Sequence, residues 1–282
     1  MSFRTYFDVP GADRSGLGDQ VAAQRERVAR RLASVARVVA VVSGKGGVGK
    51  SYVSAAVAAA AARHDAAVGV VDADLKSPTV ARMLGAAGPL AVMDDGVVPA
   101  SGAEGVRVVS SDFLLDDGRP LAWREPEGDR FVWRGALEAA ALREFLGDVA
   151  WGRLDLLLVD LPPGADGVSD LAALVPQLSG ALAVTLPSDE SGRSVARTMH
   201  ALRDAGIPLL GVVENMSGYH CDACRADRPL FAGHAGDTLA DAFRVPLLAR
   251  IPFDGSAQPA APADTWRSIA AVLLEGGRGK GP

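Results

Sequence analysis

Residues 38–51 read Val38-Val-Ala-Val-Val-Ser-Gly-Lys-Gly-Gly-Val-Gly-Lys-Ser51, and this stretch decides the fold. Its first six residues form an apolar run typical of a strand that is buried on both faces. The last eight match the pattern G-x-x-x-x-G-K-[S/T], in which glycines let backbone N–H groups surround a polyphosphate at a helix N-terminus. The stretch therefore predicts a strand, a phosphate-binding loop and a helix beginning at Lys50.

Side chains of the loop have predicted roles in nucleotide binding. We expect Lys50 to contact the β- and γ-phosphates and the Ser51 hydroxyl to ligate Mg²⁺. Lys45 adds a second ammonium group, a compact charge that fits between phosphate oxygens. Only four of the 29 basic residues are lysines, and two of these four lie in the loop. The nucleotide contacts predicted here are Gly44, Lys45, Gly46, Gly47, Val48, Gly49, Lys50, Ser51 and Tyr52.

Outward from the loop, short runs rich in Val and Leu alternate with helical stretches. The predicted strands are 38–43, 68–72, 106–110, 154–160, 181–186, 209–214 and 247–251. The predicted helices are 50–63, 137–149, 168–175, 194–205, 237–243 and 265–274, and a hairpin or excursion is expected at 90–100. This alternation predicts an α/β fold: a single-domain P-loop NTPase with a mostly parallel, doubly wound β-sheet flanked by helices.

The chain divides into an N-terminal extension (1–37) with an amphipathic helix, the P-loop domain (38–275) and a flexible tail (276–282). No apolar run reaches the roughly 18 residues of a membrane helix, and no signal-peptide pattern is visible. A net charge of −5 argues against a nucleic-acid partner. We therefore expect a cytoplasmic protein with neither a membrane nor a nucleic acid as partner, and with reduced thiols.

Three aspartates lie at the ends of predicted strands. Asp72 and Asp74 follow the strand 68–72, and Asp160 ends the strand 154–160. The carboxyl ends of parallel strands meet at one edge of a sheet, where carboxylates can hold Mg²⁺ or orient an attacking water. Asp74 and Asp160 are therefore predicted site residues, whereas Asp72 fits a structural role equally well.

Cys221 and Cys224 form a C-x-x-C pair in a predicted loop. Two thiolates at this spacing can bind one metal centre, but a [4Fe–4S] cluster or a Cys₄ zinc site needs four. A two-fold dimer is the simplest source of the second pair. A single-chain zinc site that adds His220 and His234, and a redox dithiol, are alternatives.

The segment Lys45-Gly-Gly-Val-Gly-Lys-Ser51 resembles the deviant Walker A motif of the MinD/ParA/nitrogenase-iron-protein class of P-loop ATPases. Further segments make residues 38–253 similar to the Mrp/ApbC family of iron–sulfur cluster carriers. These segments are Val71-Asp-Ala-Asp-Leu-Lys-Ser-Pro-Thr79, Trp133-Arg-Gly135, Asp148-Val-Ala-Trp-Gly152, Val159-Asp-Leu-Pro-Pro-Gly164, Val213-Glu-Asn-Met-Ser217 and Cys221-Asp-Ala-Cys224.

The resemblance implies a slow ATPase that forms a homodimer. Cys221 and Cys224 of both subunits would hold a [4Fe–4S] cluster, with zinc as the alternative metal, and the cluster would pass from donors to recipient apoproteins. The cofactors implied are ATP and Mg²⁺.

The resemblance also implies roles for individual residues. The catalytic residues would be Asp74, which positions the attacking water, Lys50, and Lys45, which reaches the partner's phosphates. Asp160 would lie near Mg²⁺ and Gly164 would sense the γ-phosphate. Asn215 would read adenine, and Pro252 belongs to the loop Ile251-Pro-Phe-Asp254 that closes over the base.

The sequence departs from the family pattern in both switch segments. Switch I has Lys76-Ser77 where a glycine usually precedes the proline, and switch II reads Gly164-Ala-Asp-Gly-Val-Ser-Asp170. Tyr52 follows Ser51 where threonine is common. These changes concern the rate of hydrolysis and the switch geometry. A MinD- or ParA-like positioning ATPase and a zinc-clamped dimeric targeting ATPase are the alternative functions.

Overall fold

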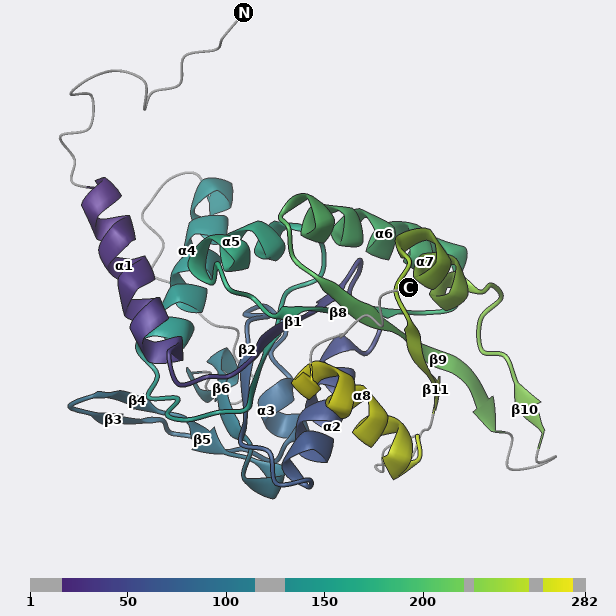
Figure 1. The fold of residues 1–282 in the computed structure, drawn as a ribbon, viewed down its shortest axis with the longest axis horizontal. Coiled ribbons are helices and arrows are strands. Elements are labelled where there is room, and N and C mark those ends of the chain that lie inside the picture. Colours follow the sequence, from purple (N-terminus) through teal and green to yellow (C-terminus); the bar gives the residue numbers. More distant parts are fainter. Residues whose placement is uncertain (1–16, 115–129, 221–225, 254–260, 276–282) are drawn as a thin grey trace, which may run out of the picture.

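The computed structural model describes residues 17–114, 130–220, 226–253 and 261–275, and a nine-stranded sheet forms its centre (Figure 1). The strand order is β10-β9-β8-β1-β7-β2-β6-β5, with β11 paired to β9. The parallel strands are β1 (Val38–Ser43), β2 (Val68–Asp72), β6 (Arg107–Ser110), β7 (Leu156–Asp160), β8 (Gly180–Thr185), β9 (Leu209–His220) and β11 (Leu247–Phe253). Two short strands are antiparallel, β5 (Ala100–Ser101) and β10 (Asp227–Arg228).

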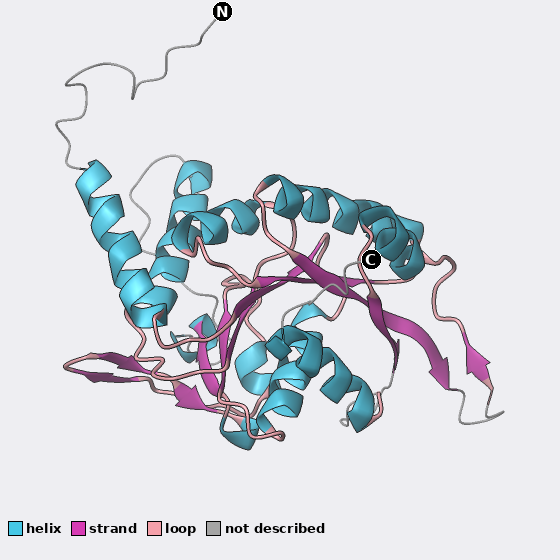
Figure 2. Cartoon of the chain, viewed as in Figure 1, coloured by secondary structure: helices cyan, strands magenta, loops and turns pink. Residues whose placement is uncertain are grey.

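Helices cover both faces of the sheet (Figure 2). One face carries α2 (Lys50–Ala62), α3 (Val80–Met83) and α8 (Ala263–Glu275). The other carries α4 (Arg130–Gly147), α5 (Asp166–Leu174), α6 (Asp189–Asp204) and α7 (Ala235–Phe243). Outside these layers, α1 (Leu17–Leu32) packs on α4, and β3 (Ala91–Met93) pairs with β4 (Gly96–Val98) in a separate hairpin. The 3₁₀ turns are Ala103–Gly105 and Ser111–Leu114.

The predicted fold class is confirmed, because the central strands contribute side chains to two separate cores. Along β7, Leu157 and Val159 enter the core beneath α4–α7, whereas Leu156 and Leu158 enter the core beneath α2 and α8. All four are fully buried. A strand covered on both faces reads as a continuous apolar run, which explains why these strands show no polar alternation.

Several predicted boundaries are wrong. The strand predicted at 209–214 continues as β9 to His220, since Asn215 pairs with Ile251 and Tyr219 pairs with Phe253 across to β11. The helix predicted at 194–205 begins at Asp189, because the Ser188 side chain caps it by accepting the N–H of Ser191. The helix predicted from residue 137 begins at Arg130, and α3 was not predicted at all.

The central strands end together at the edge that carries the functional residues. In the sheet register Asp160 of β7 pairs with both Val41 of β1 and Asp72 of β2. Because these three strands are parallel, the phosphate loop and both aspartates meet at one edge, as predicted. Over the described ranges, none of the helices has the length and apolar character needed to cross a membrane.

Candidate functional site

The phosphate loop connects β1 to α2 and is held by contacts from two other elements. Gly49 has a φ of 80°, a left-handed conformation that favours glycine. A Cβ at Gly49 would lie 2.1 Å from Nδ2 of Asn215 in β9. On the other side, the Ser194 hydroxyl of α6 donates to the carbonyl of Gly44 at 2.7 Å. A Cβ at Gly44 would lie 2.2 Å from the Ser194 backbone, so the loop fits its surroundings only with glycine at both positions.

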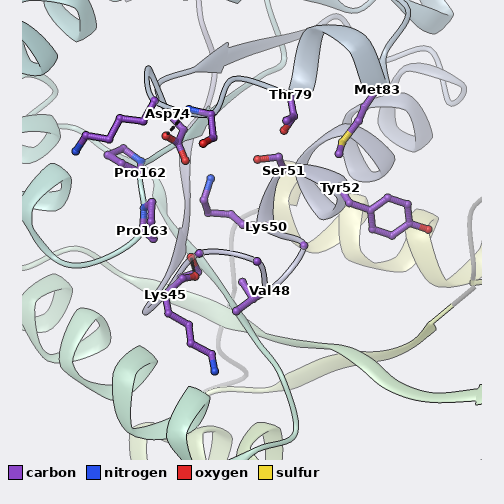
Figure 3. Close-up of a pocket in the computed structure, with 16 residues that line it drawn as sticks. Lys45, Val48, Lys50, Ser51, Tyr52, Asp74, Thr79, Met83, Pro162 and Pro163 are labelled. Atoms are coloured by element: carbon purple, nitrogen blue, oxygen red, sulfur yellow. Dashed lines mark hydrogen bonds between the residues drawn. The ribbon is translucent and has the colours of Figure 1, made fainter. Parts of the chain in front are cut away.

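A cavity of about 410 Å³ opens above the loop, within the range of small-molecule sites (Figure 3). Among the predicted residues, its lining includes Lys45, Gly46, Gly47, Val48, Gly49, Lys50, Ser51, Tyr52 and Asp74. Lys50 and Ser51 lie on the side of the cavity that faces Asp74, whereas the Lys45 side chain extends away from them. Most of the predicted nucleotide contacts therefore line this one cavity.

Asp160 joins the loop lysine and the loop serine in a buried network. Its Oδ2 atom accepts from Lys50 Nζ at 2.7 Å and from the Ser51 hydroxyl at 2.6 Å. Its Oδ1 atom accepts from the Ser54 hydroxyl at 2.6 Å. Asp160 is fully buried and Lys50 is 6% exposed, so the ion pair is shielded from water and each charge has hydrogen-bond partners. A carboxylate beside a hydroxyl is an oxygen pair that suits Mg²⁺.

Asp72 stands at the start of the switch I segment, and its carboxylate binds the backbone at the end of that segment. Its Oδ2 atom accepts the N–H groups of Thr79 and Val80 at 2.9 and 3.1 Å, and the Ser110 hydroxyl at 3.1 Å. Burial raises the pKa of Asp72 to about 7, and the Asp160 carboxylate raises it too, whereas the bonds from Val80 and Ser110 lower it. Of the two roles left open by the sequence, this geometry supports the structural one.

Asp74 lies within the segment that Asp72 closes. It is half-buried, lines the cavity, and accepts the N–H of Ser77 at 3.3 Å. Gly164, at the start of switch II, has a φ of 103° and donates its N–H to the Ser43 carbonyl at 2.9 Å. Both switch segments are therefore tied to the strand ends that flank the phosphate loop.

A model of the ParA family, described as NUBPL iron-transfer P-loop NTPase, matches residues 34–265. The chain belongs to this family. The iron-sulfur cluster carrier protein of Saccharolobus solfataricus is 40% identical over 243 residues, which cover 85% of this chain and 79% of that protein. The human cytosolic Fe-S cluster assembly factor NUBP2 is 38% identical over 229 residues, 79% of this chain and 81% of NUBP2.

Solved structures agree with this membership. A nucleotide-binding protein in complex with ADP from Archaeoglobus fulgidus has a TM-score of 0.68 and 30% identity, and the match covers 88% of this chain and 92% of that chain. The cell division ATPase MinD of Pyrococcus furiosus shares the fold, with a TM-score of 0.56 and 23% identity. The resemblance inferred from the motifs is confirmed.

In this NUBPL-type NTPase, Asn215 lies within β9 rather than at its end, and supports the phosphate loop directly. Its Nδ2 atom donates to the Val48 carbonyl at 2.9 Å, and its side chain is 3% exposed. Neither Asn215 nor Pro252 lines the 410 Å³ cavity. Their contact with adenine stays a prediction. Tyr52 does line the cavity, and its ring packs edge-on against Trp266 of α8 at 5.7 Å.

The C-x-x-C pair of the NUBPL-type chain falls outside the described residues. β9 ends at His220 and β10 begins at Asp227, so Cys221 and Cys224 belong to the connection between these two antiparallel strands. The loop position of the pair stays a prediction, and the strand before it is longer than predicted.

Sequence reasoning missed several residues that support the site. Ser54 lies one helical turn after Lys50 and Ser110 ends a strand of the same sheet edge, so helical spacing and strand-end position could have indicated both. Thr79 and Met83 line the cavity from the beginning and end of α3. Neither was predicted as a lining residue, because α3 has only four residues and its start depends on a side-chain contact with the Asp72 carboxylate, seven residues earlier.

Proposed function

We propose that this chain is an ATP-hydrolysing iron–sulfur cluster carrier that works as a homodimer. The buried contact of Lys50 and Ser51 with Asp160, at the sheet edge beneath an open cavity, is the observation that carries the nucleotide part. Family membership and the names of the relatives support the carrier part. Hydrolysis is expected to be slow, because switch II lacks the usual family sequence.

The nucleotide would be Mg²⁺-ATP. Lys50 would release Asp160 for the β- and γ-phosphates, and the Ser51 hydroxyl would turn to Mg²⁺ with Asp160 beside it. Asp74 would orient the attacking water from the facing wall. The Lys45 side chain extends away from Lys50 and Asp74 (Figure 3), and it would reach the phosphates of a second subunit.

The cargo would be a [4Fe–4S] cluster held by Cys221 and Cys224 of two subunits, since one chain supplies only half of the thiolates. β9 offers a physical connection between the two sites. Asn215 in β9 holds the Val48 carbonyl of the phosphate loop, and the same strand runs to His220, directly before Cys221. Movement of the loop on nucleotide binding would therefore be transmitted along β9 to the cysteines, for release to an apoprotein.

Reconstitution of two complementary variants tests this function. Wild type, Lys50→Ala and Cys224→Ala are purified without oxygen, supplied with iron and sulfide, and assayed for iron, sulfide, zinc, mass in solution and bound ATP. We expect about four iron atoms per wild-type dimer. Cys224→Ala should lose the cluster but still bind ATP. Lys50→Ala should keep the cluster but no longer bind ATP.

The variants serve as each other's folding control. Zinc without iron in the purified protein would favour the zinc-clamped targeting ATPase, and a metal-free dimer that binds ATP would favour a MinD- or ParA-like positioning ATPase. Either result contradicts the carrier function.

A further inference from the structure

Lys76 of switch I lies in the wall between two neighbouring cavities. One is the cavity above the phosphate loop, and the second, of about 290 Å³, lies against α4 and α5. Lys76, Pro162 and Pro163 line both. The flexible four-carbon stem of a lysine in this wall can direct its ammonium group into either cavity.

The second cavity is acidic. Glu138 of α4 and Asp166 and Asp170 of α5 line it, and Lys76 Nζ lies 2.8 Å from Oε1 of Glu138. Burial raises the pKa of Asp170, Arg143 lowers it, and Asp166 and Glu138 raise it again. In the described structure, Lys76 is therefore held by the negative charge of this cavity. Lys76 of switch I thus meets Asp166 and Asp170 of switch II here.

The ion pair with Glu138 is easily exchanged. Lys76 is 66% exposed and Glu138 is 30% exposed, and pairs exposed to this degree contribute about 1 kcal/mol or less. The γ-phosphate of ATP brings further negative charge to the other cavity, and a terminal phosphate attracts an ammonium group more strongly than a single carboxylate does.

Switch I geometry determines which phosphate Lys76 can reach. Asp72 binds the N–H groups of Thr79 and Val80, so residues 73–78 form a short loop closed at its base. Asp74 of this loop stands across the cavity from Val48 of the phosphate loop (Figure 3). A nucleotide whose β-phosphate lies on the phosphate loop presents its γ-phosphate to this facing wall.

We propose that Lys76 is a specificity-determining residue that distinguishes ATP from ADP by exchanging Glu138 for the γ-phosphate. With ADP the ammonium group stays on Glu138, and with ATP it leaves α4 and turns into the nucleotide cavity. Because Asp74 lies two residues away in the same closed loop, this exchange also places Asp74 for the attacking water. The inference rests on the ATPase function proposed above.

Binding measurements on two single variants and their double variant test the exchange. The titrants are ADP and a non-hydrolysable ATP analogue, each with Mg²⁺. We expect Lys76→Ala to weaken binding of the analogue ~10-fold and binding of ADP less than ~2-fold. Glu138→Gln, which frees Lys76, should tighten the analogue ~3-fold and leave ADP unchanged. In the Lys76→Ala background, Glu138→Gln should have no effect, because it acts through Lys76.

Arg63→Ala and Glu104→Gln are the matched controls, since they make the same charge changes in an exposed pair at 2.9 Å that lines neither cavity. They should leave both affinities as in wild type. Equal losses of ADP and analogue in Lys76→Ala would overturn the inference, as would an effect of Glu138→Gln that persists without Lys76. Wild type that bound neither nucleotide would instead overturn the ATPase function itself.

Discussion

Asp160 receives three hydrogen bonds at a fully buried position, and its only charged partner in those bonds is Lys50. Removal of one partner of a buried ion pair leaves the other charge uncompensated, at a cost of about 3–5 kcal/mol. The site residue that would bind phosphate therefore also stabilises the chain when no phosphate is bound.

Lys50→Ala should consequently lose ATP binding and also lower the free energy of unfolding by about 3 kcal/mol. Urea unfolding measures the second effect. The double variant Lys50→Ala/Asp160→Asn serves as control, because it removes both charges and should recover part of the loss. A single variant as stable as wild type would show that the buried pair contributes nothing to stability.

The raised pKa of Asp72 predicts that the free energy of unfolding depends on pH. Its pKa is about 7 in the folded chain against 3.8 in the unfolded one, so between these values the folded state binds more protons. The free energy of unfolding contributed by Asp72 therefore falls as the pH rises, by up to about 1.4 kcal/mol per pH unit between about pH 4 and pH 7.

Asp72→Asn should remove this contribution, so that its stability relative to wild type improves from pH 5 to pH 8. Urea unfolding of both proteins at several pH values measures the difference. A constant difference across that range would contradict the assignment of the titration to Asp72.

At the scale of elements, the phosphate loop depends on the strand that passes behind it. Gly49 has a left-handed backbone, and the Asn215 amide occupies the place of a Cβ. These are separate constraints, one on conformation and one on space.

Gly49→Ala should therefore cost more than Gly206→Ala. Gly206, which follows α6, has a φ of 71° with nothing near the place of its Cβ, so its variant measures the conformational cost alone, roughly 1–2 kcal/mol. Gly49→Ala adds the clash with Asn215 and should abolish nucleotide binding. Thermal unfolding and ATP titration compare them, and equal costs would mean that Asn215 moves aside freely.

The elements near the site differ in how far the sequence predicts them. The apolar runs of β1, β2 and β7 and the glycines of the loop carry local signals, so the sheet edge and the positions of Lys50, Asp160 and Asp74 could be predicted. The start of α3 depends on the Asp72 side chain seven residues earlier, and the extension of β9 depends on β11, which is distant in the sequence. Lys76 was visible as a departure from the family pattern, but its contact with Glu138 depends on packing between switch I and α4.

At the scale of the whole molecule, β9 links the phosphate loop, through Asn215, to His220, the residue before Cys221 in the chain. His220 follows Asn215 by five residues, and the strand between them carries a bulge, since its pairing with β11 shifts register between Ile251 and Phe253. The parallel pairing of β9 with β8 and β11 holds its first part on both sides.

Hydrogen exchange should reveal this connection. We expect ATP to slow amide exchange in residues 44–51 and also along β9 as far as Tyr219, whereas the hairpin of β3 and β4 should not change. Asn215→Ala, which removes the bond to the Val48 carbonyl, should keep protection in the loop and lose it in β9. Protection of β9 that survived in this variant would exclude Asn215 as the link.

The bulge in β9 has a consequence for the mechanics of the strand. Met216, directly after Asn215, has a φ of 53°, and the pairing with β11 shifts register between Ile251 and Phe253. A bulge bends a strand locally and interrupts its ladder of hydrogen bonds. A displacement of Asn215 would therefore turn the segment that leads to His220 about this bend, and would change its direction more than its extension.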